Sequence, residues 1–141
     1  MLDARVTQHS VARTICRPGY VDEVSPPLDR MIAHRDALLQ RHGIDPDDRD
    51  DYALDRRVPV LLGGSPEAPA NLDLLPWAGH DGERRKDLLA VKLKRCVCAG
   101  KISLRDAQGI ISGNWPAHYL DVTHMSCDSD GDGMASDDGG S

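Results

Sequence analysis

The residues best suited to chemistry lie in one segment of this chain, residues 52–77, with the sequence YALDRRVPVLLGGSPEAPANLDLLPW. In this segment an acidic residue, Asp55, is followed at once by two arginines, Arg56 and Arg57. Arginine has a pKa above about 12, so Arg56 cannot accept a proton under ordinary conditions, but its fork of N–H donors can bind a phosphate. These side chains therefore suit phosphate binding, and Arg56 cannot serve as a general base.

The same segment resembles the central hairpin of HNH (ββα-metal) endonucleases. In that family an acidic residue and a histidine precede a hydrophobic-Pro-hydrophobic strand, a Gly-Gly turn and an Asn-Leu pair. The matching residues in this chain are Asp55, Pro59, Gly63, Gly64, Asn71 and Leu72. Shorter strings resemble a bacterial subgroup of small HNH-like proteins, namely TICRPGY, SPP, KDLL, VCAG, SL, AQ and W. Their order and spacing carry the resemblance, which covers roughly residues 6–115.

The resemblance implies metal-dependent hydrolysis of nucleic-acid phosphodiesters, with DNA a more natural substrate than RNA. A divalent cation, which could be Mg²⁺, Mn²⁺, Zn²⁺ or Ni²⁺, would stabilise charge on the phosphate and on the leaving oxygen. Asp55 matches the metal ligand of the family, and His80, in the loop GHDGE, is the nearest histidine for a further ligand. Arg56 stands where the family has its catalytic histidine, and Asn71 matches the residue whose amide braces the loop.

Three interpretations follow from an arginine at the position of the base. The first is a working nuclease in which another group or hydroxide supplies the base. The second is a degenerate nuclease domain that keeps a nucleic-acid surface, and the third is a structural or interaction domain. Elsewhere, His34, His42, His118 and His124 have no motif around them, and they are expected to be ordinary solvated or half-buried side chains.

The net charge of −6 is concentrated at the C-terminal end of the chain. Six of the 23 acidic residues and none of the 17 basic residues lie from Asp121 onward, which leaves 17 of each before it. The candidate nucleic-acid contacts are Arg57, Arg84, Arg85 and Lys86, the last three of which belong to a basic cluster that continues to Lys101. Such a cluster can face phosphates, but it is more often a solvated helix face.

The hydrophobic pattern and the resemblance together predict an α+β fold. Its ββα-metal (HNH-like) core would be a short two-stranded hairpin packed on a helix, with additional helices toward both termini. We expect strands at residues 58–62 and 71–75, a long helix at 83–99 that packs on them, an amphipathic helix at 28–42 behind them, and a short helix capped by Ser103. Two adjacent prolines argue against a helix in residues 18–27, and the charged residues 45–51 are expected to form a surface loop.

The domain is expected to span residues 6–116, and residues 117–141 are expected to form an acidic, Gly- and Ser-rich disordered tail. Within that tail, residues 128–133 (DSDGDG) resemble the first half of a calcium loop, but the twelfth position is Gly139 instead of Glu. A solvating acidic tail is therefore the preferred interpretation.

Four cysteines, Cys16, Cys96, Cys98 and Cys127, allow two disulfides, a metal site or four inert thiols. Cys96 and Cys98 are too close in sequence for a zinc knuckle. Cys16 and Cys98 lie in the segments that most resemble the subgroup, so we predict that they are close in space. A bridge between them would favour an exported protein. No stretch approaches the roughly 18 apolar residues of a membrane span, and there is no signal-peptide pattern. A soluble protein without membrane contact is expected, and its compartment and oligomeric state stay open.

Overall fold

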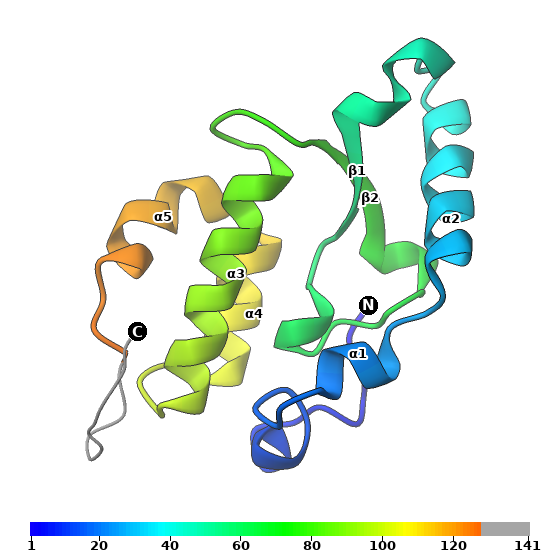
Figure 1. Ribbon diagram of the computed structural model, residues 1–141. Helices are drawn as coiled ribbons and strands as arrows, with labels where there is room; N and C mark the ends of the chain where they lie inside the picture. Colours follow the sequence, from blue (N-terminus) through cyan, green and yellow to red (C-terminus); the bar gives the residue numbers. More distant parts are fainter. Residues whose placement is uncertain (128–141) are drawn as a thin grey trace.

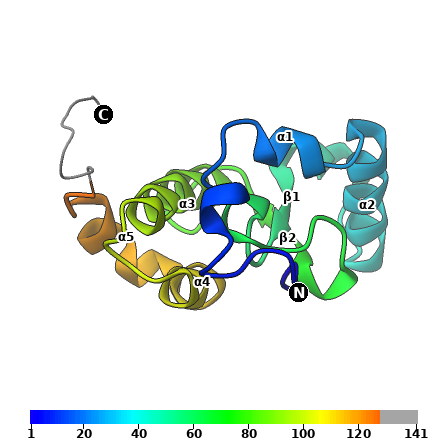
Figure 2. The ribbon, with the colours of Figure 1, turned by 90° about the horizontal axis from the view of Figure 1, so that it is seen from below.

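The structure, a computed structural model that describes residues 1–127, has a β-hairpin between two groups of helices (Figure 1). Strands β1 (Tyr52–Arg56) and β2 (Leu72–Pro76) pair antiparallel, with Asp55 opposite Asp73. Helix α2 (Leu28–Arg41) lies along one side of the hairpin. Helices α3 (Glu83–Cys98), α4 (Leu104–Ser112) and α5 (Trp115–Thr123) lie together on the other side, as the view from below also shows (Figure 2). The α+β class is therefore confirmed.

The remaining regular elements are short. They are helix α1 (Tyr20–Val24) and four 3₁₀ turns, η1 (Val11–Arg13), η2 (Pro46–Asp51), η3 (Val60–Leu62) and η4 (Pro69–Asn71). No helix among residues 1–127 has the length and apolar character needed to cross a membrane.

The predicted strand at residues 58–62 is wrong, because β1 ends before it and residues 60–62 form the η3 turn. Val58, Val60 and Leu62 are buried in the core, as they would be on one face of a strand, so their burial does not decide between strand and turn. The Asn71 side chain bonds both backbone groups of Val58 that a neighbouring strand would use. Pro59 has no N–H to offer a partner strand. The hairpin exists, but its first strand lies several residues earlier than predicted.

The hydrophobic core lies between the η3 turn and helices α3, α4 and α5. Leu89, Leu93 and Val97 share one face of α3 and are buried, as their spacing predicts. Helix α3 packs on α5, α4 and η3, and the helix that packs on both strands is α2. The prediction that α2 lies behind the hairpin is thus confirmed. The long helix α3 contacts the η3 turn after β1 more than it contacts either strand.

Two segments in which the sequence predicted no regular structure, residues 18–27 and 117–127, contain helices. Prolines at 26 and 27 end α1 but do not prevent it, and its first residue, Tyr20, is buried. The residues after Trp115 continue as α5, where Pro116 occupies the first turn and needs no N–H partner. The expected boundary at residue 116 therefore falls inside a helix that packs on α3. Residues 117–123, which were expected to belong to the disordered tail, are helical. The rest of the predicted tail from residue 128, with the calcium-like loop at 128–133, lies outside the described residues.

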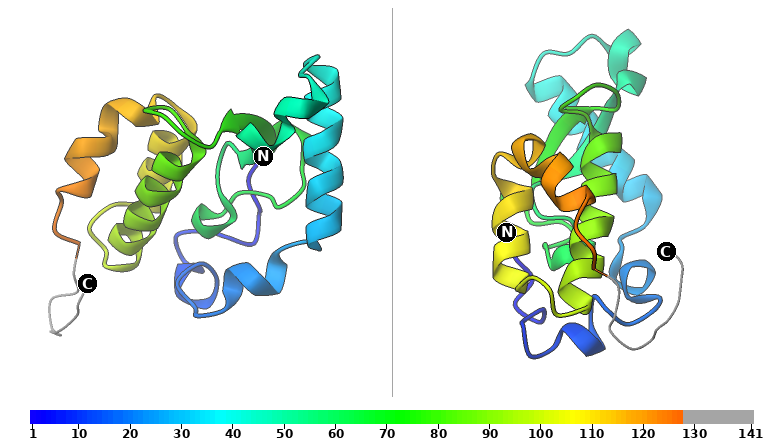
Figure 3. Two further views of the ribbon diagram at one scale, coloured as in Figure 1. Left: turned by 45° about the horizontal axis from the view of Figure 1, so that its top comes forward. Right: turned by 90° about the vertical axis from the view of Figure 1, so that its left-hand side faces the viewer.

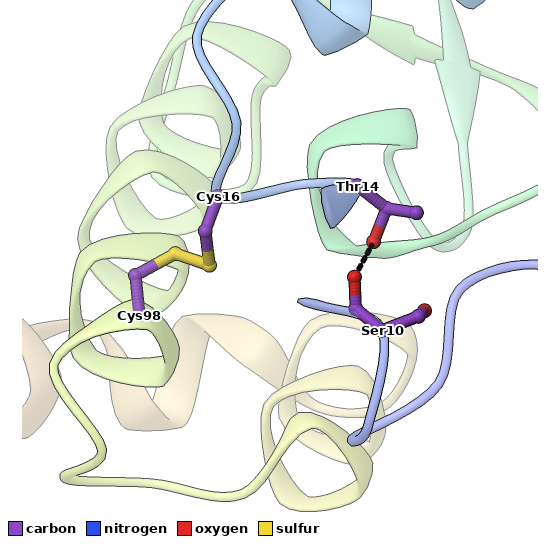
Figure 4. Close-up of a disulfide and its surroundings, with 4 residues drawn as sticks. All are labelled: Ser10, Thr14, Cys16 and Cys98. Carbon is purple, nitrogen blue, oxygen red and sulfur yellow. Dashed lines mark hydrogen bonds between the residues drawn. A yellow bond between two sulfur atoms is a disulfide. The ribbon is translucent and has the colours of Figure 1, made fainter. Parts of the chain in front are cut away.

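Two disulfides fasten Cys16 and Cys127 to the last turn of α3. Cys16 is bonded to Cys98 with a Cα–Cα distance of 5.8 Å, which confirms the predicted proximity (Figure 4). Cys96 is bonded to Cys127, a pairing that the sequence did not single out. The hydroxyl of Thr14 donates to the carbonyl of Ser10 beside the first bridge (Figure 4). The N-terminal segment and the segment after α5 are thus both covalently tied to one helix.

Candidate functional site

The central feature of the candidate site is a buried ion pair between the hairpin and α3. Lys86 donates from Nζ to both carboxylate oxygens of Asp55, at 3.0 and 3.1 Å, and to the carbonyl of Arg56 at 3.0 Å. The Lys86 and Asp55 side chains are only 4% and 7% exposed. An ammonium has three protons to donate, so these contacts use all of them. The carboxylate that the resemblance assigns to a metal is therefore already paired with a cation.

Glu83, one turn before Lys86 on α3, completes this cluster. Burial, together with the hydrogen bond and charge of Asp55, raises the pKa of Glu83 to about 9. Its carboxyl is therefore protonated at neutral pH and can donate a hydrogen bond to the Asp55 carboxylate. A charged Asp55, a charged Lys86 and a neutral Glu83 sum to zero net charge, which limits the cost of burying them.

The residues around Asp55 do not fit a divalent cation. A metal at this carboxylate would have to displace the Lys86 ammonium, or it would lie beside a buried positive charge. Within residues 1–127, no group of three His, Cys, Asp or Glu side chains could hold a metal ion. The positive charge that balances Asp55 in this structure is the ammonium group of Lys86.

Arg56 faces away from this cluster, although it stands where the resembling family has its catalytic histidine. Successive side chains of a strand point to opposite faces, so Asp55 faces α3 and Arg56 faces α2. The Arg56 Nε donates to the carbonyl of Pro66 at 2.9 Å, and its Nη2 lies 3.1 Å from the sulfur of Met31. Burial lowers the pKa of Arg56, yet a guanidinium stays protonated at neutral pH.

Asn71 is fully buried and braces the loop after β1. Its amide oxygen accepts from the Val58 N–H, and its amide nitrogen donates to the carbonyls of Val58 and Ser65, each at 2.9 Å. The adjacent Gly64 is required here, since a Cβ at this position would overlap the carbonyl of Val58. The geometry agrees with the bracing role that the resemblance implied.

The other predicted site residues lie on the surface, with one exception. The side chain of His80 is 68% exposed and pairs with Asp81, its neighbour in the loop before α3. Arg57 pairs with Asp73 across the hairpin, and Arg84 lies over the ring of Trp77. Arg85, which is half-buried, lies over the ring of Tyr119 of α5. The exception is Lys86, which the sequence grouped with the basic surface and which is buried.

A second cluster, which the sequence analysis missed, lies on the α2 side of the hairpin. Glu67 accepts from Arg30 at 2.8 Å and pairs with the Nε2 of His34 at 3.0 Å. Arg30 and His34 are four residues apart and so share one face of α2, which is a signal visible in the sequence. Their carboxylate partner is more than 30 residues away and could not be identified from that signal.

No protein-family model, curated protein or solved structure matches this chain. Its function therefore has to be inferred from its own residues and their geometry.

Proposed function

We propose that this chain is an HNH-like domain, built on a ββα-metal core, that binds nucleic acid without metal-dependent cleavage. The observation that carries this proposal is the buried pair of Lys86 with both oxygens of Asp55. A fixed ammonium neutralises the carboxylate where a metal would otherwise bind. The neighbouring Arg56 points to the other face of the hairpin and cannot act as a base.

The support for an HNH-like core comes from the order of its parts. A hairpin is followed by the long helix α3, and Asp55 near the end of β1 meets the first turns of that helix. Asn71 braces a Gly63-Gly64 turn between the two strands, as the resemblance implies. The two disulfides are typical of proteins that work outside the reducing cytosol.

The support for nucleic-acid binding comes from the surface beside this core. Arg84 is exposed at the start of α3 and lies 5.8 Å from the ring centre of Trp77, which is half-buried. A basic side chain beside an aromatic ring suits a strand whose phosphates and bases are both accessible. Arg57, half-exposed just after β1, lies toward the other end of the hairpin and offers a second guanidinium to a longer strand. We expect Arg84, Trp77 and Arg57 to form the contact.

Binding and cleavage are tested separately. Fluorescence anisotropy with labelled single- and double-stranded oligonucleotides should show salt-dependent binding by the wild type. Arg84→Ala should weaken binding and lower the salt slope by about one, because one phosphate contact is lost. Arg41→Ala, which removes an exposed arginine from the far end of α2, is the matched control and should leave binding unchanged.

Cleavage is measured by plasmid nicking with Mg²⁺, Mn²⁺, Zn²⁺ and Ni²⁺ in parallel. We expect no metal-dependent cleavage by the wild type or by Arg56→His, since this side chain faces α2 and Lys86 still pairs with Asp55. Metal-dependent nicking by the wild type would overturn the proposal in favour of a working nuclease. An absence of binding to every oligonucleotide would instead favour a structural or interaction domain.

A further inference from the structure

The cluster on the α2 side of the hairpin combines a histidine, a carboxylate and two guanidinium groups. His34 and Arg30 lie on α2, and Glu67 lies in the loop before β2. This loop rests against α2 (Figures 1 and 3). Arg56 reaches the same place from β1, because it bonds to Pro66, next to Glu67, and to Met31, one turn before His34. Three separate segments therefore converge here.

The pairing with Glu67 determines which nitrogen of His34 can act. A carboxylate only accepts hydrogen bonds, so the Nε2 of His34 must carry the proton that it shares with Glu67. The Nδ1 of the neutral ring is then an acceptor, and no residue among 1–127 donates to it. The hydrogen bonds from His34 and Arg30 lower the pKa of Glu67, so its charge persists at neutral pH. A carboxylate that orients an imidazole in this way is the arrangement of a general base.

The two guanidinium groups give this site a positive flank. Arg56 is held in place by Pro66 and Met31, and its Nη1 has no hydrogen bond to the described residues. The Nη1 of Arg30 donates to Glu67, whereas its Nε and Nη2 make no hydrogen bond within residues 1–127. The free N–H groups of both guanidinium groups can donate hydrogen bonds to a phosphate. The side chains of His34 and Arg30 are 36% and 56% exposed, so a ligand can reach them.

We propose that His34 and Glu67 form a general-base dyad that cleaves RNA without a metal, with Arg30 and Arg56 binding the phosphate. The inference rests on the proposed function only in that the chain must bind nucleic acid. It differs from the expectation that DNA is the preferred partner, and the reason is chemical. RNA carries its own nucleophile, the 2′-hydroxyl, so cleavage needs no metal-activated water.

The cleavage reaction needs no reactant other than the RNA and water. The Nδ1 of His34 takes the proton of the 2′-hydroxyl, the 2′-oxygen bonds to phosphorus, and the bond from phosphorus to the 5′-oxygen breaks. The departing 5′-oxygen takes a proton from water, and the imidazolium returns its proton to the hydroxide that remains. Arg30 and Arg56 stabilise the charge that gathers on the phosphate oxygens. The products are a 2′,3′-cyclic phosphate and a 5′-hydroxyl end.

The test is the cleavage of a labelled single-stranded RNA oligonucleotide in excess EDTA by the disulfide-intact protein. The wild type should cleave it to 2′,3′-cyclic phosphate ends and should leave the 2′-O-methyl form of the same oligonucleotide intact. His34→Gln keeps a donor for Glu67 and a similar volume but has no base, so it should lose about 10²- to 10⁴-fold in rate. His42→Gln, which removes an exposed histidine just after α2, is the matched control and should retain full activity.

Each outcome separates this inference from a purely structural role of the cluster. If Arg30, His34 and Glu67 only hold the loop on α2, His34→Gln will cleave as fast as the wild type, and the inference is overturned. A wild type that binds RNA but does not cleave it overturns the inference and leaves the proposed function standing. A wild type that binds no nucleic acid overturns both. Cleavage of the 2′-O-methyl oligonucleotide would also refute the mechanism, because that substrate has no nucleophile.

Discussion

Glu83 should make the stability of this protein fall as the pH rises. In the folded protein its pKa is about 9, whereas its ordinary value is 4.5. Between these values the folded state holds a proton that the unfolded state has released. The free energy of unfolding should therefore decrease by up to about 1.4 kcal/mol per pH unit over this window. The contribution is complete below the lower value and lost above the higher one.

The variant Glu83→Gln isolates this contribution. Glutamine keeps an N–H donor for Asp55 and fills the same space, but it does not titrate. The stability of the variant relative to the wild type should therefore increase with pH, by up to about 4 kcal/mol between about pH 5 and about pH 8. Its free energy of unfolding should depend less on pH than that of the wild type.

Urea unfolding at several pH values, with the disulfides intact, measures this difference. The m value should stay the same in both proteins, so that a shift of the midpoint reports stability alone. Glu23→Gln, which removes an exposed carboxylate of α1, is the matched control, and the pH dependence of its stability should equal that of the wild type. If the free energy of unfolding of Glu83→Gln depends on pH as strongly as that of the wild type, Glu83 is not held protonated beside Asp55.

Three further predictions concern the contacts that hold the site together. Lys86→Met leaves the Asp55 charge buried and unpaired, so it should cost about 3 to 5 kcal/mol in urea unfolding. Adding Asp55→Asn should recover part of that loss, and a fully additive double variant would argue against the pair. Asn71→Ala removes three buried hydrogen bonds and should cost about 2 to 4 kcal/mol, and a loss below 1 kcal/mol would show that it does not brace the loop. Replacing Cys16 and Cys98 by serine opens a sequence separation of 82 residues and should cost about 4 kcal/mol in the same assay. An unchanged unfolding midpoint in the serine variant would mean that the bridge is not formed in solution.

Much of the helical structure was predictable because the signals that define it are local. Leu89, Leu93 and Val97 recur at four-residue spacing and are buried on one face of α3. The Ser103 hydroxyl accepts from the backbone of Asp106 three residues later, which is the cap that the sequence predicts. The resemblance also identified Cys16 and Cys98 as neighbours, although these residues are far apart in the chain.

The position of β1 could not be determined from such local patterns. In residues 58–62 buried and half-buried positions alternate, and this pattern suits a strand and a buried turn equally well. The choice at residues 58–62 was made by Asn71, whose amide bonds the backbone of Val58. The start and end of β1 in turn decide that Asp55 faces α3 and Arg56 faces α2.

The sequence by itself determined which chemical groups are present and where helices α2, α3 and α4 form. Tertiary structure alone decided which groups meet and what charge they carry. Lys86 reaches Asp55 across 31 residues, and His34 reaches Glu67 across 33, so no local spacing predicts either pair. The proton on Glu83 depends on burial and on the nearby Asp55 charge. Both conditions arise only when the hairpin and α3 come together, because a carboxyl exposed to water in the unfolded chain keeps its ordinary pKa.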